Sequence, residues 1–419
     1  MSVYDYILSV LDNPDLFLTI LFCILFLMII LNKLMFGKFI NGLFGMEFSL
    51  LFVASVVVHL YVINAIVGSR LIHYLLVEGS VFYLLIIFYK RILKRKNEFR
   101  LSLDYFFNKY SSIPALIICL AIVVNVFFVP WNGDSRIGFQ TNYWFSLLRP
   151  LITLFYPLLV IGFFVHLHNK NKKLAFFHLF LIILYSISAG SKASFLLALI
   201  TWFLVYRDIY NPNSLGMLRD HWPLVVIGAF GAIINLAVLN VDLIKVIGRL
   251  ISYGDAAIML YQAHDPTLAC SNLSYLALMH RGLARLFGDS GATNIDTLFG
   301  FALSIEFYGS NTFTGPNARL GPYVLCAFPG WSIILFALMF ILYILMLNSL
   351  LTSKKLFMKK ELRLALSLPF VISSINGYMV DYNKGASDMT FVVLFYGFLF
   401  IYSVMVLASK PHNNKEVRA

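Results

Sequence analysis

Long apolar runs separated by short polar segments dominate this chain. Runs long enough to cross about 30 Å of hydrocarbon as helices occur at about 16–31, 48–67, 71–89, 113–130, 147–167, 223–240, 324–350, 364–380 and 389–408. One further run, 174–206, is interrupted by Ala189-Gly190-Ser191-Lys192, and we interpret it as two short helices. The pattern predicts an all-α polytopic membrane protein with about 11 transmembrane helices.

The composition of the 419 residues excludes an ordinary water-soluble protein. Hydrophobic residues make up 60% of the chain and charged residues only 12%, and the mean hydropathy is +0.83. A soluble domain carries about a quarter charged residues. The net charge of +12 would suggest a nucleic-acid partner in a soluble protein, but here the basic residues are first sorted by side of the membrane, and no nucleic acid is expected.

Basic residues are distributed unequally between the two sides of the predicted membrane. With two helices in 174–206, 22 of the 32 Lys and Arg residues fall on one side and 10 on the other. The positive-inside rule then predicts a periplasmic N-terminus and a cytoplasmic C-terminus in a bacterial inner membrane. A single helix over 174–206 would instead turn the basic cluster Lys354–Arg363 outward. The short basic cytoplasmic loops are expected to contact anionic membrane lipids.

Three segments follow from this topology. Residues 1–240 form an N-terminal transmembrane bundle of about 8 spans, residues 241–321 a large periplasmic loop, and residues 322–419 a C-terminal bundle of about 3 spans. The loop is too long for a simple connection. Apolar residues at helical spacing predict amphipathic helices near its start, beginning at Val241, and over Leu273–Phe287.

Motifs of soluble chemistry are absent from the sequence. It contains no glycine-rich phosphate loop, no His-Glu-x-x-His and no Asp-x-Asp. Cys23 and Cys119 lie inside apolar runs, Cys326 begins one, and Cys270 stands alone in a polar stretch, so neither a disulfide nor a metal site is expected. We therefore predict no cofactor.

The predicted outer side carries cations that oppose the positive-inside rule. Arg149 precedes Pro150 at the mouth of one span, and Lys192 lies in the turn of the interrupted run. The large loop adds Arg249, Arg281, Arg285, Asn317 and Arg319 as candidate ligands of an anionic group. Guanidinium groups match phosphate oxygens bidentately. Salt bridges with the outer carboxylates, or contacts with lipid head groups, are the alternative for each cation.

The whole-chain arrangement resembles the Wzy-type O-antigen polymerases, the oligosaccharide repeat-unit polymerases of bacterial envelopes. The resemblance lies in the number of spans, the basic cytoplasmic loops, the large periplasmic loop in the C-terminal half, the turn Ser188–Lys192 and the Thr314–Gly330 entry to the span that follows the loop. It implies a C-type glycosyltransferase (GT-C) membrane fold. Lys192 stands where the family more often has Arg.

The resemblance implies a metal-independent glycosyltransferase that makes O-antigen or a related surface glycan in lipopolysaccharide biosynthesis. A growing undecaprenyl-diphosphate-linked oligosaccharide would be transferred onto a lipid-linked repeat unit at the periplasmic face, and a chain-length regulator protein would be a further partner. Such transfer needs a base near the acceptor hydroxyl and fixed cations for the diphosphate. His280, Glu306 and Asp289 are the catalytic candidates.

Two other function classes stay open on the sequence. A flippase or transporter of lipid-linked oligosaccharides would also carry internal cations, but it would not need a loop of this length and should show two similar halves. An O-antigen ligase would share the fold and the loop and differ in its acceptor.

Overall fold

The described part of the chain is helical. The computed structural model describes residues 90–128, 143–189, 194–210, 332–353 and 358–380, with separate positions in 84–88, 216–230, 323 and 394–405. Its helices are α5 (Lys96–Tyr110), α6 (Ser112–Phe128), α8 (Tyr143–His168), α9 (Lys172–Ser188), α10 (Ser194–Tyr210), α19 (Ser332–Thr352) and α20 (Lys360–Val380). No strand occurs among these residues. The all-α prediction is confirmed for them, whereas the spans at 16–31 and 48–67 and the loop at 241–321 lie outside.

The interrupted run at 174–206 forms two helices, as predicted. Helix α9 ends at Ser188 and α10 begins at Ser194. The last residue of α10, Tyr210, lies beside the last residue of α8, with 6.3 Å between the Tyr210 and His168 ring centroids. Because α9 starts directly after α8, α10 must run antiparallel to α9 and return to the end from which α9 started.

A defined turn connects α8 to α9. Lys170 adopts a left-handed backbone with φ of 57°, and the Asn171 amide donates to the His166 carbonyl at 2.9 Å. This is the geometry that closes helix C-termini. The Asn171 side chain then accepts from the Leu174 amide at 3.4 Å and caps the start of α9. The chain therefore reverses direction within three residues.

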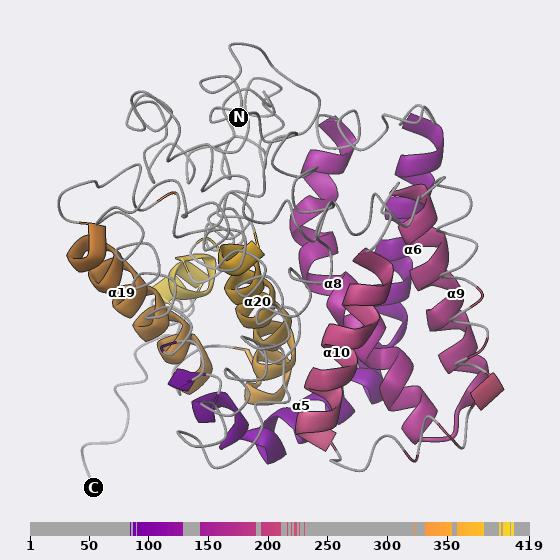
Figure 1. The fold of residues 1–419 in the computed structure, drawn as a ribbon, viewed down its shortest axis with the longest axis horizontal. Coiled ribbons are helices and arrows are strands. Elements are labelled where there is room, and N and C mark those ends of the chain that lie inside the picture. Colours follow the sequence, from indigo (N-terminus) through magenta and orange to yellow (C-terminus); the bar gives the residue numbers. More distant parts are fainter. Residues whose placement is uncertain are drawn as a thin grey trace, which may run out of the picture.

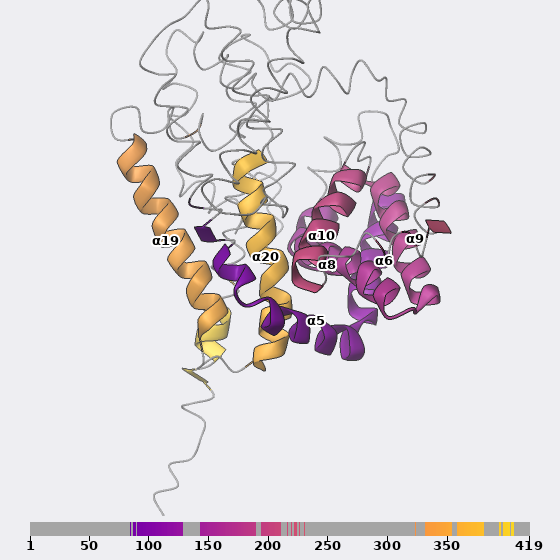
Figure 2. The same cartoon turned by 60° about the horizontal axis from the view of Figure 1, so that its bottom comes forward.

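Helix α5 corrects one prediction. We expected residues 90–109 to be a short basic loop, but residues 96–110 form an amphipathic helix. Phe99, Leu103, Phe106 and Phe107 are buried on one face. The axis of α5 is bent by 68° from that of α6, and α5 runs across the ends of the other helices (Figure 1, Figure 2).

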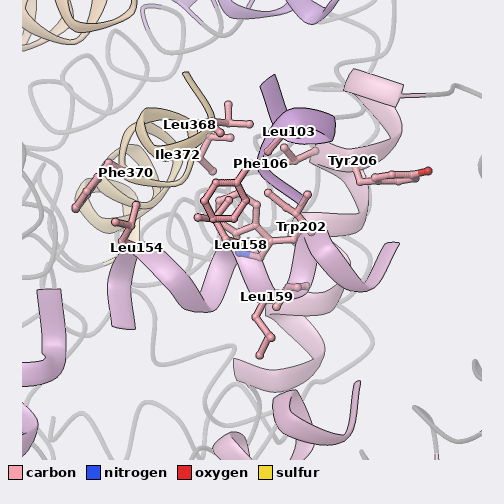
Figure 3. Close-up of a cluster of buried hydrophobic side chains, with 14 of the residues drawn as sticks. Leu103, Phe106, Leu154, Leu158, Leu159, Trp202, Tyr206, Leu368, Phe370 and Ile372 are labelled. Atoms are coloured by element: carbon pink, nitrogen blue, oxygen red, sulfur yellow. The ribbon is translucent and has the colours of Figure 1, made fainter. Parts of the chain in front are cut away.

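Four helices, α5 among them, share one buried core. Leu103 and Phe106 of α5 lie among side chains of α8, α10 and α20 (Figure 3). Leu158 of α8 and Leu368 of α20 are both fully buried within this cluster. Helix α20 has the most extensive contact with α5 among the described helices, so α5 joins the C-terminal helices to the N-terminal bundle.

Only part of the predicted membrane-spanning pattern can be compared with the helices. Among the described residues, Leu151–His168 is long and apolar enough to cross a membrane, and α5 with α6 would count as a second span if the bent pair were one unit. Helices α6, α9 and α10 have 17 residues each. That length corresponds to about 25 Å, at the lower limit for crossing. The total of about 11 spans stays a prediction.

Hydrogen bonds and an ion pair gather the basic segments at the α5 end. The Arg95 guanidinium donates to the Leu351 carbonyl at 2.9 Å, and the Lys360 ammonium lies 2.9 Å from the Glu98 carboxylate. Four basic segments therefore share one end of the described helices. They are Lys90–Lys109, Lys170–Lys173, Arg207 and Lys359–Arg363. The charge count assigns these same segments to one side of the membrane, the cytoplasmic side. That this end of the helices faces the cytoplasm stays a prediction.

A hydrogen bond and a cation–π contact hold α10 to α5 at the same end. The Tyr210 hydroxyl donates to the Asp104 carboxylate at 2.9 Å, and the Arg100 guanidinium lies 5.7 Å from the Tyr210 ring centroid. Burial and, after it, the nearby Asp104 charge raise the pKa of the Tyr210 hydroxyl far above its usual range. Tyr210 therefore stays protonated and keeps its role as a donor.

Candidate functional site

A polar cluster lies toward the end of the bundle opposite to α5. It comprises Asn125 near the end of α6, Tyr156 in α8, and Tyr185, Ser186 and Ser188 in the last turn of α9. Each of these residues interrupts an otherwise apolar stretch. Polar side chains inside predicted transmembrane helices are costly to bury, and they are functional candidates for that reason.

One hydrogen bond joins α6 to the end of α9 in this cluster. The Asn125 amide nitrogen donates to the Ser188 hydroxyl oxygen at 3.1 Å, and that hydroxyl donates to the Tyr185 carbonyl at 3.0 Å. Asn125 is fully buried. Its amide oxygen has no hydrogen-bond partner among the described residues.

Two tyrosines continue the cluster from α8 to α9. The rings of Tyr156 and Tyr185 lie 4.9 Å apart between centroids, inclined by 45°. The Tyr156 hydroxyl also forms a hydrogen bond with the Ser186 side chain. The last turn of α9 is thus held to both α6 and α8, which fixes the point from which residues 189–193 begin.

The polar cluster can position other groups through hydrogen bonds. Amide and hydroxyl groups donate and accept hydrogen bonds, but they supply neither a fixed charge nor a base at neutral pH. No set of three or more His, Cys, Asp or Glu side chains in the described residues is arranged to hold a metal ion. A catalytic base or a charged phosphate ligand near this end must therefore come from elsewhere in the chain.

The structure describes only one of the predicted site residues, and only its backbone. Arg149 lies in the first half of α8, two turns before Tyr156, and so toward the polar-cluster end. Lys192 belongs to the break between α9 and α10, just outside the described residues. Arg249, His280, Arg281, Arg285, Asp289, Glu306, Asn317 and Arg319 also lie outside the described residues.

A buried histidine pair near the α8–α9 turn was missed by the sequence analysis. The rings of His166 in α8 and His178 in α9 lie 4.8 Å apart between centroids, and both residues are buried. The His178 Nδ1 atom lies 2.8 Å from the Leu174 carbonyl oxygen, which assigns the ring proton to Nδ1. The Nε2 atoms of both rings lack a hydrogen-bond partner within the described residues.

This histidine pair is packed against a glycine. A Cβ atom built at Gly162 of α8 would lie 3.2 Å from the His178 ring and 2.7 Å from the Phe107 ring. Gly162 therefore permits the close approach of α5, α8 and α9, as small residues do at helix interfaces in membranes. The tight packing favours a structural role for the pair. Two histidines inside apolar runs were the signal in the sequence.

Comparison of the chain with models of protein families, with curated proteins and with solved structures gives no match.

Proposed function

We propose that the chain is a polytopic membrane protein with about 11 spans. Apolar side chains exposed on the outside of the bundle support this. Leu116, Leu120, Val123 and Phe127 follow one another at helical spacing along α6 and are 46–76% exposed. Helix α19 exposes a similar face that includes Leu338 and Leu342, each at least 55% exposed. Soluble monomers rarely expose such continuous apolar surface, whereas lipid tails would cover it.

The orientation that we propose places the α5 end in the cytoplasm. That end carries the basic segments, and short loops rich in Lys and Arg face the cytoplasm. The polar cluster, Arg149 and the break that contains Lys192 then belong to the periplasmic half of the bundle. The N-terminus would be periplasmic and the C-terminus cytoplasmic, in a bacterial inner membrane.

We further propose that the protein is a metal-independent polymerase of O-antigen or a related surface glycan. It would transfer a growing undecaprenyl-diphosphate-linked glycan onto a lipid-linked repeat unit at the periplasmic face. The carrying observation is the alternation of helix directions, which turns the start of α8 and the α9–α10 break toward the same end, away from the basic segments. Two of the predicted phosphate ligands, Arg149 and Lys192, belong to that end.

The remaining groups are assigned from the sequence. Arg281, Arg285 and Arg319 would join Lys192 in binding the diphosphate, with Arg149, Arg249 and Asn317 as further substrate ligands. Cations fixed before the reaction stabilise the charge of the leaving diphosphate. His280, Glu306 or Asp289 would accept the proton of the acceptor hydroxyl. The polar cluster would hold the α9–α10 break in place beneath this site.

The reaction is tested with purified protein and lipid-diphosphate-linked repeat units alone. We expect the units to lengthen into a ladder of products in EDTA and without any nucleotide, because the donor is already activated on its lipid. Gel electrophoresis of the released glycans measures the ladder.

Other outcomes of this experiment identify other functions. A flippase would move the units between leaflets and leave them unextended, and a ligase would join them to lipid A core but not to each other. Folded protein that extends no lipid-linked unit with the cognate sugars would refute the polymerase proposal.

The orientation is tested by thiol labelling of single cysteines in a cysteine-free background. Asn97 and Asn171 are exposed at the α5 end, so cysteines there should be inaccessible to an impermeant reagent in intact cells, as should one at Asn413. Cysteines at Ser191 and Asn272 should react. Labelling at Thr352 combined with none at Asn272 would contradict the topology.

A further inference from the structure

Exposed cations gather where α5 meets the start of α20. Arg91, Lys94, Lys96, Lys359 and Lys360 are all exposed, and we call this group the basic junction. The Arg95 contact with the Leu351 carbonyl and the Lys360 contact with Glu98 hold the two segments together. Its members come from parts of the chain more than 260 residues apart, and they form one surface only in the folded protein.

The charge of this surface is strongly unbalanced. Residues 90–98 and 358–363 contain eight Lys and Arg side chains and two carboxylates, Glu98 and Glu361. Glu98 is already paired with Lys360. Arg91, Lys94, Lys96 and Lys359 are exposed beside this pair, where an anionic partner can reach them.

The position of α5 favours a lipid partner over a soluble one. The 68° bend between α5 and α6 lays α5 across the ends of the other helices (Figure 2). Leu101 on α5 is 66% exposed, and Ile87, one helical turn before Arg91, is 57% exposed. Cations next to exposed apolar side chains at the end of membrane helices match the head groups and upper acyl chains of a leaflet.

We propose that the basic junction binds the phosphate head groups of anionic phospholipids in the cytoplasmic leaflet. This rests on the membrane orientation proposed above. A lipid phosphate bound there contacts ammonium groups of both α5 and α20. Lipid binding therefore strengthens the attachment of the C-terminal helices to the N-terminal bundle, far from the glycan site.

The test uses the full-length protein, purified in a neutral detergent without any glycan. Phosphatidylglycerol or phosphatidylcholine is added, and bound lipid is counted by native mass spectrometry. We expect the wild type to retain phosphatidylglycerol in preference to phosphatidylcholine. The triple variant Lys94→Gln, Lys96→Gln, Lys359→Gln should bind phosphatidylglycerol about tenfold more weakly or worse, because each cation near an anionic surface adds to binding.

A matched control removes the same charge elsewhere at the same end. The variant Lys170→Gln, Lys172→Gln, Lys173→Gln alters three exposed lysines of the α8–α9 turn and should bind phosphatidylglycerol like the wild type. Glu98→Gln removes a carboxylate from the basic junction and should bind at least as tightly as the wild type. This second variant keeps all the cations and the Arg95 contact with the Leu351 carbonyl. Its lipid binding therefore reports the change in charge and not a loss of the fold.

Equal losses in the two triple variants, or no preference of the wild type for phosphatidylglycerol, would overturn the proposal. Displacement of the lipid by millimolar glycerol phosphate would also overturn it, since the site would then recognise free phosphate. Because no glycan is present, failure of the polymerase reaction would not alter these readouts.

Discussion

Replacement of Arg281 or Arg285 by alanine should abolish polymer formation while the protein accumulates normally in the membrane. The two arginines lie one helical turn apart in the predicted second loop helix and are assigned to the leaving diphosphate. Loss of one preorganised group that stabilises developing charge costs roughly 10²–10³ in rate. Lysine should rescue only partly, because an ammonium cannot make the forked contact of a guanidinium. Product ladders from membranes with matched protein levels measure the effect.

A lysine of the opposite end provides the control for these variants. Lys172→Ala removes an exposed cation at the start of α9, beside the α5 end, and should leave the ladder unchanged. If both arginine variants instead kept full activity, Arg281 and Arg285 would be solvated charges and the second loop helix only a scaffold.

Gly162→Ala should destabilise the protein more than any ordinary Gly→Ala change in a helix. The new methyl group would lie 2.7 Å from the buried Phe107 ring and 3.2 Å from the His178 ring. Neither ring has free space, because Phe107 and His178 are 4% and 1% exposed. Overpacking of this kind costs about 1–3 kcal/mol. Thermal unfolding in detergent should show a clear fall in the midpoint, and Gly162→Leu should prevent accumulation of folded protein.

Two other glycines serve as matched controls for Gly162. A Cβ atom at Gly216 or Gly397 would meet no atom within 4 Å in the described structure. Both positions are helical, so alanine there should be neutral or stabilising by up to about 1 kcal/mol. A Gly162→Ala midpoint equal to that of these controls would show that α5 can move away from α8 without cost.

The sequence was most informative where apolar length or a chain-breaking turn decides the structure. The apolar runs at 113–130 and 147–167 predicted α6 and α8 to within a few residues. The sequence Gly190-Ser191-Lys192 correctly predicted that α9 and α10 are separate. Such features depend on the local chain alone, and so they can be recognised without knowledge of the tertiary packing.

Helix α5 was missed because its charge drew the interpretation toward a loop. Lys90 to Lys109 contains seven cations, which suggested a topology signal and contact with anionic lipids. Yet Phe99, Leu103, Phe106 and Phe107 repeat at the spacing of an amphipathic helix, and all four are buried. Testing the basic loops for helical periodicity would have identified α5.

The polar cluster could not be predicted as a cluster. Asn125 and Ser188 are separated by 63 residues, and their hydrogen bond depends on how α6 and α9 pack. The sequence shows each residue as an isolated polar position in an apolar run. The predicted catalytic residues lie in 241–321, outside the described residues, so their grouping stays a prediction.

The position of α5 also sets an order for biosynthesis. Arg95 and its partner Leu351 are separated by 256 residues, so α5 emerges from the ribosome well before α20, the described helix with the most extensive contact with it. At about 5–20 residues per second, this delay amounts to roughly 10–50 s. During that interval Phe99 and Leu103 lack α20 as a partner, and in the membrane orientation that we propose the bilayer surface would cover them. Chains that terminate before residue 360 never receive that partner, and the apolar face of their α5 stays uncovered by α20.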